Sequence, residues 1–104
     1  MGMKIGRNSQ INSSNISDPF LITLGDRVTV GGSATVTAHY GQQGFLILAP
    51  TRIGNNVTLG MKCTIMGGVT IGDDVKILPN SVVLPKTTIP KGEIWGGVPA
   101  IKIG

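Results

Sequence analysis

The sequence predicts an all-β chain that winds as a parallel β-helix, a solenoid with three short strands in each coil. Aliphatic residues recur at every sixth position from Ile53 to Ile89 without a slip. A fixed short repeat is typical of solenoids, and a period of six without drift argues against an α-helix. Valine, isoleucine and threonine favour strands, and 16 glycines supply tight corners.

The first part of the chain carries the same rhythm with one irregularity. Ile5 begins a pass, and Leu24 begins the regular hexads that follow it. The two are 19 residues apart, one more than three hexads. We expect the extra residue, around Asp18-Pro19-Phe20, to be absorbed as a bulge or a corner.

Stacking predicts which side chains share the interior. Each first hexad residue should point inward and lie above its equivalent 18 residues earlier, on strands about 4.8 Å apart. The expected columns are Ile53, Ile71 and Ile89; Leu59, Ile77 and Trp95; and Ile65 and Val83. Trp95 is then an end cap, and Cys63, in a small inward slot, is a buried structural thiol. Asp73 and Lys91 should form an outward charge pair.

The rhythm breaks once in the middle of the chain. After Val36 the clean repeat resumes only at Ile53, and the 11 surplus residues are not a multiple of six. A loop must therefore leave the solenoid near residues 39–52, where the chain reads HYGQQGFLILAPTR. Its second half is strongly apolar, so we expect Phe45 to Leu48 to pack against another subunit. Long loops on rigid scaffolds often carry function, and this one begins with the only histidine, His39.

Length and composition limit the number of domains, the partners and the location that can be expected. The 104 residues predict a single β-helix domain over 1–104. The net charge is +4, but the nine lysines and arginines are scattered, which argues against a nucleic-acid partner. The longest apolar run, residues 45–50, is too short to cross a membrane. A single cysteine excludes an intrachain disulfide framework, so a cytoplasmic location is expected.

Four stretches resemble the hexapeptide-repeat acyltransferases: TAHYGQQG, then TRIGNNV from Thr51, GGVTIGD from Gly67 and GGVPAI from Gly96. The family forms left-handed parallel β-helices, and the hexads of this chain amount to about four and a half coils. The resemblance also implies a homotrimer that binds acetyl-CoA between subunits and acylates a small molecule. It places the catalytic residue at His39 and cofactor contacts at Gly67, Gly68, Lys86 and Lys102.

The chemistry suits a histidine. An acceptor hydroxyl or amine attacks a thioester poorly until its proton can leave, and a neutral imidazole within hydrogen-bond reach accelerates such a step about 10²–10⁴-fold. His39 stands three residues past Val36, near a corner and at the root of the loop. The competing interpretation is that His39 is only a polar corner or interface residue. Tyr40 either assists His39 or covers the base of the loop.

Two other functions stay open. One is a non-catalytic trimeric assembly or binding module, because the LPNS segment and the IWGGVPA ending also resemble the terminal β-helix modules of peptide-synthetase-like proteins. The other is a γ-type carbonic anhydrase, which shares the solenoid. That enzyme needs three histidine ligands for each zinc, drawn from two subunits, and with one histidine in each chain this site cannot be built in the known way.

Overall fold

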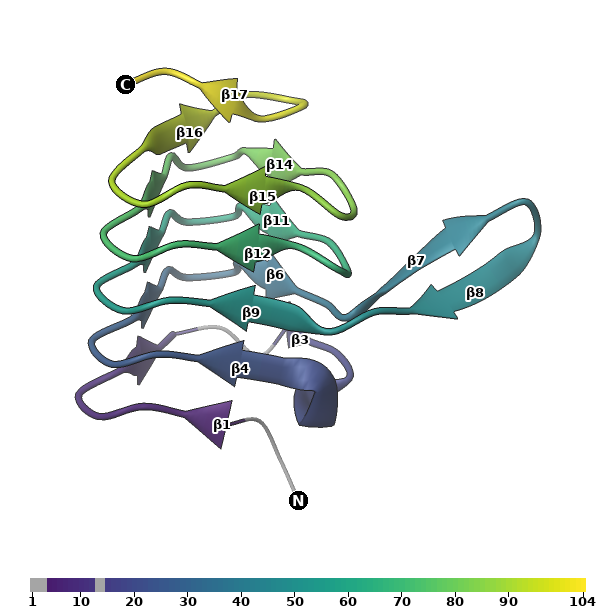
Figure 1. Cartoon of the computed structure of the whole chain (residues 1–104), viewed down its shortest axis with the longest axis horizontal. Coiled ribbons are helices and arrows are strands. Elements are labelled where there is room, and N and C mark those ends of the chain that lie inside the picture. Colours follow the sequence, from purple (N-terminus) through teal and green to yellow (C-terminus); the bar gives the residue numbers. More distant parts are fainter. Residues whose placement is uncertain (1–3, 13–14) are drawn as a thin grey trace.

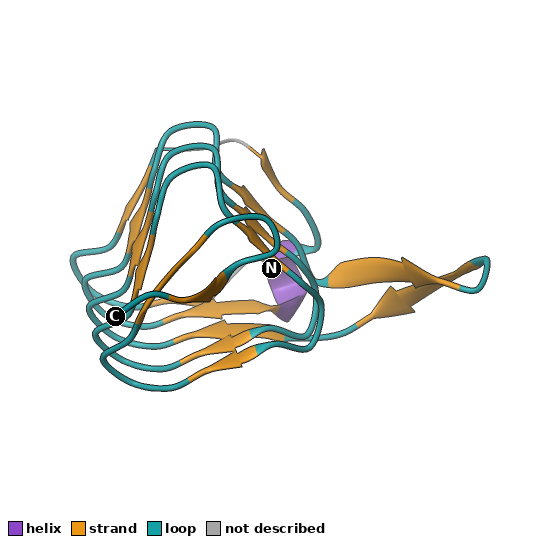
Figure 2. Cartoon of the chain, turned by 90° about the horizontal axis from the view of Figure 1, so that it is seen from above, coloured by secondary structure: helices purple, strands orange, loops and turns teal. Residues whose placement is uncertain are grey.

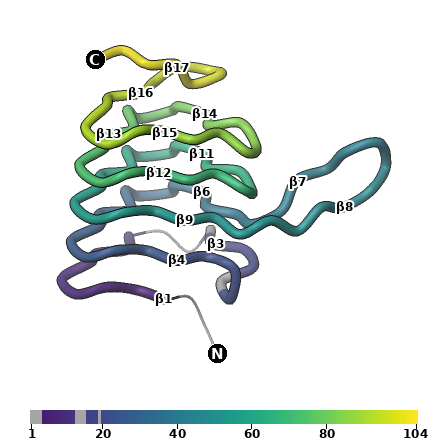
Figure 3. The backbone as a smooth tube through the Cα atoms, viewed as in Figure 1, coloured from purple at the N-terminus to yellow at the C-terminus, as the bar shows by residue number. Residues whose placement is uncertain are grey.

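The computed structural model describes residues 4–12 and 15–104 and shows a triangular prism of stacked coils with one projecting hairpin (Figure 1). As the chain rises from the N-terminus, the strands in front run to the left and those behind run to the right. This winding is left-handed, as the tube in Figure 3 also shows. The prediction of a left-handed parallel β-helix is confirmed.

Three sheets, parallel except for the last strand β17, form the sides of the prism (Figure 2). Face 1 consists of β1 (Lys4–Ile5), β4 (Ile22–Leu24), β9 (Thr51–Ile53), β12 (Thr70–Ile71) and β15 (Thr88–Ile89). Face 2 consists of β2 (Gln10–Ile11), β5 (Thr29–Val30), β10 (Thr58–Leu59), β13 (Lys76–Ile77), β16 (Ile94–Gly96) and β17 (Ile101–Lys102). Face 3 consists of β3 (Asn15–Ile16), β6 (Thr35–Val36), β11 (Thr64–Ile65) and β14 (Val82–Val83). The hairpin is β7 (His39–Gln42) with β8 (Phe45–Leu48).

The interior columns lie where the hexad count places them. Ile53 pairs with Ile71, and Ile71 with Ile89, on face 1. The equivalent columns on faces 2 and 3 are also paired in register, Leu59 with Ile77 and Trp95, and Ile65 with Val83. All of these aliphatic side chains are buried, so the hexad rhythm is the rhythm of the core.

The early irregularity is a turn at the corner between faces 3 and 1. Ile5 pairs with Leu24, which confirms the net surplus of one residue. The pairing of Ile16 with Val36 localises it further, because eight residues rather than six separate Ile16 from Leu24. The single-turn 3₁₀ helix η1 (Pro19–Leu21) takes up this length. The surplus therefore lies where the sequence predicts it, around Asp18-Pro19-Phe20.

A ladder of side-chain oxygens links the coils at the corner between faces 1 and 2. The Asp26 amide donates to Asn55 Oδ1 at 2.7 Å, and the Asn55 amide donates to Asp73 Oδ1 at 2.8 Å. The predicted charge pair between Asp73 and Lys91 is wrong. The Asp73 carboxylate accepts a backbone amide from the coil below, which satisfies a donor that no strand partner reaches.

The C-terminal end of the prism is covered. Strand β17 turns back antiparallel to β16, and Trp95 lies half-buried above Ile77, with its indole N–H donating to Glu93 at 2.9 Å. The expectation that Trp95 is an end cap is confirmed. In the part of the chain that the structure describes, no helix has the length and apolar character needed to span a bilayer.

The close approach of successive coils at the corner between faces 1 and 2 can be tested by adding one methyl group to a glycine there. In Gly54→Ala the new Cβ would lie 2.9 Å from the carbonyl carbon of Gly72, and only a backbone shift can relieve that contact. We expect the free energy of unfolding to fall by about 1–3 kcal/mol in urea denaturation. Gly41→Ala, which adds the same methyl group in open space, should change it by less than about 0.5 kcal/mol. Equal effects of the two variants would contradict tight stacking at this corner.

Candidate active site

The hairpin leaves the prism at the corner between faces 3 and 1. It takes the place of the loop predicted near residues 39–52, and its two strands are antiparallel. Its two ends are locked together. The Ala49 amide donates to the Ala38 carbonyl at 2.8 Å, and the buried Thr51 hydroxyl donates to the Thr37 carbonyl at 2.6 Å. The root of the hairpin is therefore a fixed part of the solenoid, and His39 is its first strand residue.

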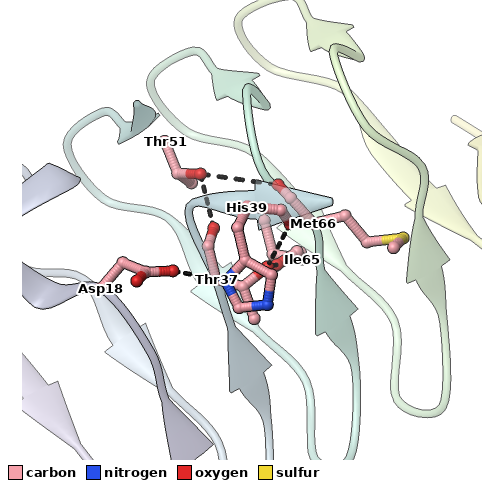
Figure 4. A network of polar contacts seen from close by, with 6 residues as sticks. All are labelled: Asp18, Thr37, His39, Thr51, Ile65 and Met66. Atoms are coloured by element: carbon pink, nitrogen blue, oxygen red, sulfur yellow. Dashed lines mark hydrogen bonds and ion pairs between the residues drawn. The ribbon is translucent and has the colours of Figure 1, made fainter. Parts of the chain in front are cut away.

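His39 is paired with Asp18, as Figure 4 shows. Imidazole Nδ1 contacts Asp18 Oδ2, and the other ring nitrogen points away from the carboxylate. Asp18 comes directly before η1 and has a φ of 57°, while the Leu21 amide donates to its carbonyl at 2.9 Å. The turn that absorbs the surplus residues thus aims the carboxylate at the coil above.

This pairing has a chemical consequence for the ring. A neutral histidine whose Nδ1–H donates to a carboxylate keeps a free lone pair on Nε2, which can accept a proton. The His39 side chain is 34% exposed and that of Asp18 is 24% exposed, so Nε2 remains within reach of a ligand. The arrangement can therefore act as a base that is oriented by an acid residue.

Asp18 is the functional candidate that sequence reasoning missed. It was seen only as part of an insertion, 21 residues before His39. The available signal was that both breaks in the rhythm fall between face 3 and face 1. Insertions at equivalent positions of successive coils must emerge at the same corner, one above the other.

Three of the four expected cofactor contacts lie at this corner. The Gly67 amide donates to the His39 carbonyl at 3.3 Å, and a Cβ on Gly67 would lie 2.5 Å from the His39 nitrogen. Gly68 has a φ of 78° and packs between Ala49 and the Lys86 side chain. Only glycine fits at position 67 without a backbone shift, and the positive φ at position 68 favours glycine.

Lys86 lies over Tyr40 at the base of the hairpin. Its Nζ lies 5.5 Å from the centroid of the Tyr40 ring, within the range of a cation–π contact. Tyr40 is buried, with 7% of its surface exposed. In the structure Tyr40 covers the base of the hairpin, and Lys86 covers Tyr40.

Lys102 lies apart from this group. It belongs to the capping strand β17 on face 2, and its Nζ is 3.5 Å from Glu93 Oε2. The structure therefore brings together His39, Gly67, Gly68 and Lys86, but not Lys102. Within residues 4–12 and 15–104, no three His, Cys, Asp or Glu side chains are grouped as metal ligands would be.

Similarity to known proteins covers most of the chain. Residues 50–89 match the family model described as bacterial transferase hexapeptide (six repeats). Galactoside O-acetyltransferase of Escherichia coli (strain K12) is 37% identical over 103 residues, which are 91% of this chain and 50% of that protein. Delta-poly-L-ornithine synthetase of Acinetobacter baumannii (strain AB307-0294) is 28% identical over the whole chain, which matches 8% of that protein.

Two further likenesses bear on the fold and on the choice of function. Mitochondrial gamma carbonic anhydrase 2 of Arabidopsis thaliana is 34% identical over 102 residues, 91% of this chain and 32% of that protein. The crystal structure of a hexapeptide-repeat-containing acetyltransferase from Vibrio cholerae, complexed with acetyl coenzyme A, superposes with a TM-score of 0.88. It is 28% identical, and the match covers 99% of this chain and 60% of that one. The chain spans half or less of the length of the three sequence relatives.

Cys63 is the one thiol, and it is inert in the fold. It is fully buried, as its place in the small inward slot predicts, and burial raises the pKa of its thiol to about 11. Because only the thiolate reacts readily, the native protein at pH 8 should not react with Ellman's reagent, and one thiol should appear in denaturant. Rapid labelling of the folded protein would contradict a closed interior.

Proposed function

The chain is a hexapeptide-repeat protein with the left-handed β-helix fold, and from that premise we propose that it is an acyl-CoA-dependent acyltransferase. The simplest reaction is transfer of an acetyl group from acetyl-CoA to a hydroxyl or amine of a small molecule, in the cytoplasm. The observation that carries the proposal is the His39–Asp18 pair at the root of the hairpin. Two relatives with this fold are acetyltransferases by name, and one of them was crystallised with acetyl coenzyme A.

His39 would remove the proton from the acceptor. With Nδ1–H held by Asp18, Nε2 accepts the hydroxyl or amine proton as the acceptor atom bonds to the thioester carbonyl carbon. The carbon–sulfur bond then breaks, and the proton on Nε2 passes to the departing sulfur, which leaves His39 neutral again. Asp18 holds the ring in one tautomer and stabilises the imidazolium that forms between the two steps.

Acetyl-CoA supplies an activated acyl group and an anionic handle. Gly67, Gly68 and Lys86 are the residues of this corner that would hold it, and Lys86 offers the positive charge. Lys102 was expected to do the same, but its ammonium is already paired with Glu93. We therefore assign the cofactor contact first to Lys86, and Lys102 stays a prediction by resemblance.

A non-catalytic module is the second candidate. The observation that favours it is the match of the whole chain to a small part of a synthetase that is about 12 times longer, since the match is 8% of that protein. A β-helix module of that kind would keep the fold and the trimer without turnover. Cofactor binding separates the two functions.

The first experiment measures affinity and turnover separately. Isothermal titration of the wild type with acetyl-CoA should show binding, and CoA release should depend on an acceptor from a panel of sugars, amino acids and amines. His39→Ala should keep the dissociation constant within about 2-fold and lower kcat about 10²–10⁴-fold. Asp18→Asn keeps the shape but removes the charge, and should lower kcat by less. Unchanged kcat in His39→Ala would remove His39 from catalysis, and no binding at millimolar acetyl-CoA would favour the module.

The second experiment compares the two lysines. If Lys86 meets the anionic part of the donor, Lys86→Met should weaken acetyl-CoA binding about 10-fold, because a charge-assisted hydrogen bond is worth about 1.5–3 kcal/mol. Lys102→Met should change it by less than about 2-fold. The reverse order would assign the anionic part of the donor to Lys102 instead of Lys86.

A further inference from the structure

A buried hydroxyl stands at a position where the packing of the prism favours a hydrocarbon. Among the described side chains, Thr51 and Ser81 are the two that are both polar and buried, each 0% exposed. In the stack of inward residues Thr51 lies above Ile22, and the register of β9 with β12 places Val69 above Thr51. Both neighbours are aliphatic and buried. Valine has nearly the shape of threonine and no hydroxyl to bury, so packing alone gives no reason for a threonine here.

The hydroxyl of Thr51 is used at the root of the hairpin (Figure 4). Thr51 Oγ1 donates to the Thr37 carbonyl at 2.6 Å, whereas the Met66 carbonyl lies 3.5 Å away, at the limit of a hydrogen bond. Among the described residues, no other group donates to the Thr37 carbonyl. Thr37 precedes the hairpin and Thr51 follows it. This bond therefore ties the two ends of the hairpin together where they join the prism.

A second hydroxyl extends the connection to His39. Thr37 Oγ1 lies 3.3 Å from the carbonyls of both His39 and Ile65, as a donor to either (Figure 4). The Gly67 amide also donates to the His39 carbonyl, at 3.3 Å. Both contacts to the His39 carbonyl are long. The orientation of the His39 backbone therefore depends on Thr37, which Thr51 holds by a shorter bond.

The direction of the His39 ring follows from the direction of its backbone. Nδ1 has to reach Asp18 in the coil below, and η1 fixes the place of that carboxylate. Without the Thr51 hydroxyl, the Thr37 carbonyl would lose its donor, and the peptide that follows it could turn toward water or another donor. Because His39 is only two residues further on, such a turn would move the imidazole away from the carboxylate. A misplacement of about 1 Å can cost about 10²-fold in rate.

We propose that Thr51 is a positioning residue for the general base. Its buried hydroxyl orients the Thr37 carbonyl and, through it, the His39 ring toward Asp18. The effect on the rate rests on the proposed function, whereas the orientation of the ring does not depend on turnover. Thr51 is fully buried and so touches neither donor nor acceptor. Its loss should therefore change kcat and leave the binding of acetyl-CoA intact.

Two substitutions separate the hydroxyl of Thr51 from its volume. Thr51→Val keeps the shape and removes the hydroxyl, and should lower kcat about 10-fold with the KM for acetyl-CoA within about 2-fold of the wild type. Thr51→Ser keeps the hydroxyl and removes a buried methyl group, and should lower the urea midpoint of unfolding but keep the wild-type kcat. The matched control is Ser9→Ala, which removes hydroxyl bonds to Gly25 and Val28 at the corner between faces 1 and 2. It should lower the urea midpoint and leave kcat unchanged.

Nitrogen-15 spectra of the single histidine give a measurement that needs no acceptor. Above the pH at which the His39 ring becomes neutral, Thr51→Val should shift part of its population from a proton on Nδ1 to a proton on Nε2. Thr51→Ser and Ser9→Ala should keep the wild-type tautomer. A ring that is unshifted in Thr51→Val, together with an unchanged kcat, would overturn the proposal.

The serine variant keeps the test decisive if Thr51→Val does not fold. Wild-type kcat and tautomer in Thr51→Ser would support the role of the hydroxyl, and loss of either would overturn it. A wild type that shows no turnover would contradict the proposed function instead. The spectra alone would then decide whether Thr51 orients His39, so the two failures are distinguishable.

Discussion

Stacking of equivalent residues in successive coils is the constraint on which the rest of the structure depends. The parallel strands of the prism form their ladder hydrogen bonds with the coils above and below, so every coil must repeat the outline of its neighbours. A residue that departs from this outline either fits at a corner or leaves the prism. Each coil contacts only its neighbours, and stability is then roughly a sum over these interfaces.

The same constraint positions the chemistry. Surplus residues in two adjacent coils emerge at one corner, and this brings Asp18 of the lower coil to His39 of the coil above. Neither residue depends on a flexible loop, because η1 fixes the first and the hydrogen-bonded hairpin root fixes the second. A rigid scaffold that holds an acid–base pair at an open edge is well suited to acyl transfer, in which orientation supplies much of the rate.

The core could be predicted from the sequence because burial enforces it. An inward slot accepts only a residue of the right size, so Ile53, Cys63 and Trp95 all lie where the hexad count places them. Exposed corners are less constrained, since several polar contacts there have similar energies. For that reason Asp73 accepts a backbone amide rather than pairing with Lys91, and Lys102 pairs with Glu93. Asp18 escaped detection because its partner is close in space but belongs to another coil.

The protonation of the single histidine tests the central claim most directly. Nitrogen-15 spectra of the labelled protein, recorded above the pH at which His39 becomes neutral, report which ring nitrogen carries the proton, and no other histidine overlaps the signal. The pairing with Asp18 predicts a proton on Nδ1 and a free lone pair on Nε2, with a shift toward the other tautomer in Asp18→Asn. A wild-type ring protonated on Nε2 would contradict a general base at this corner.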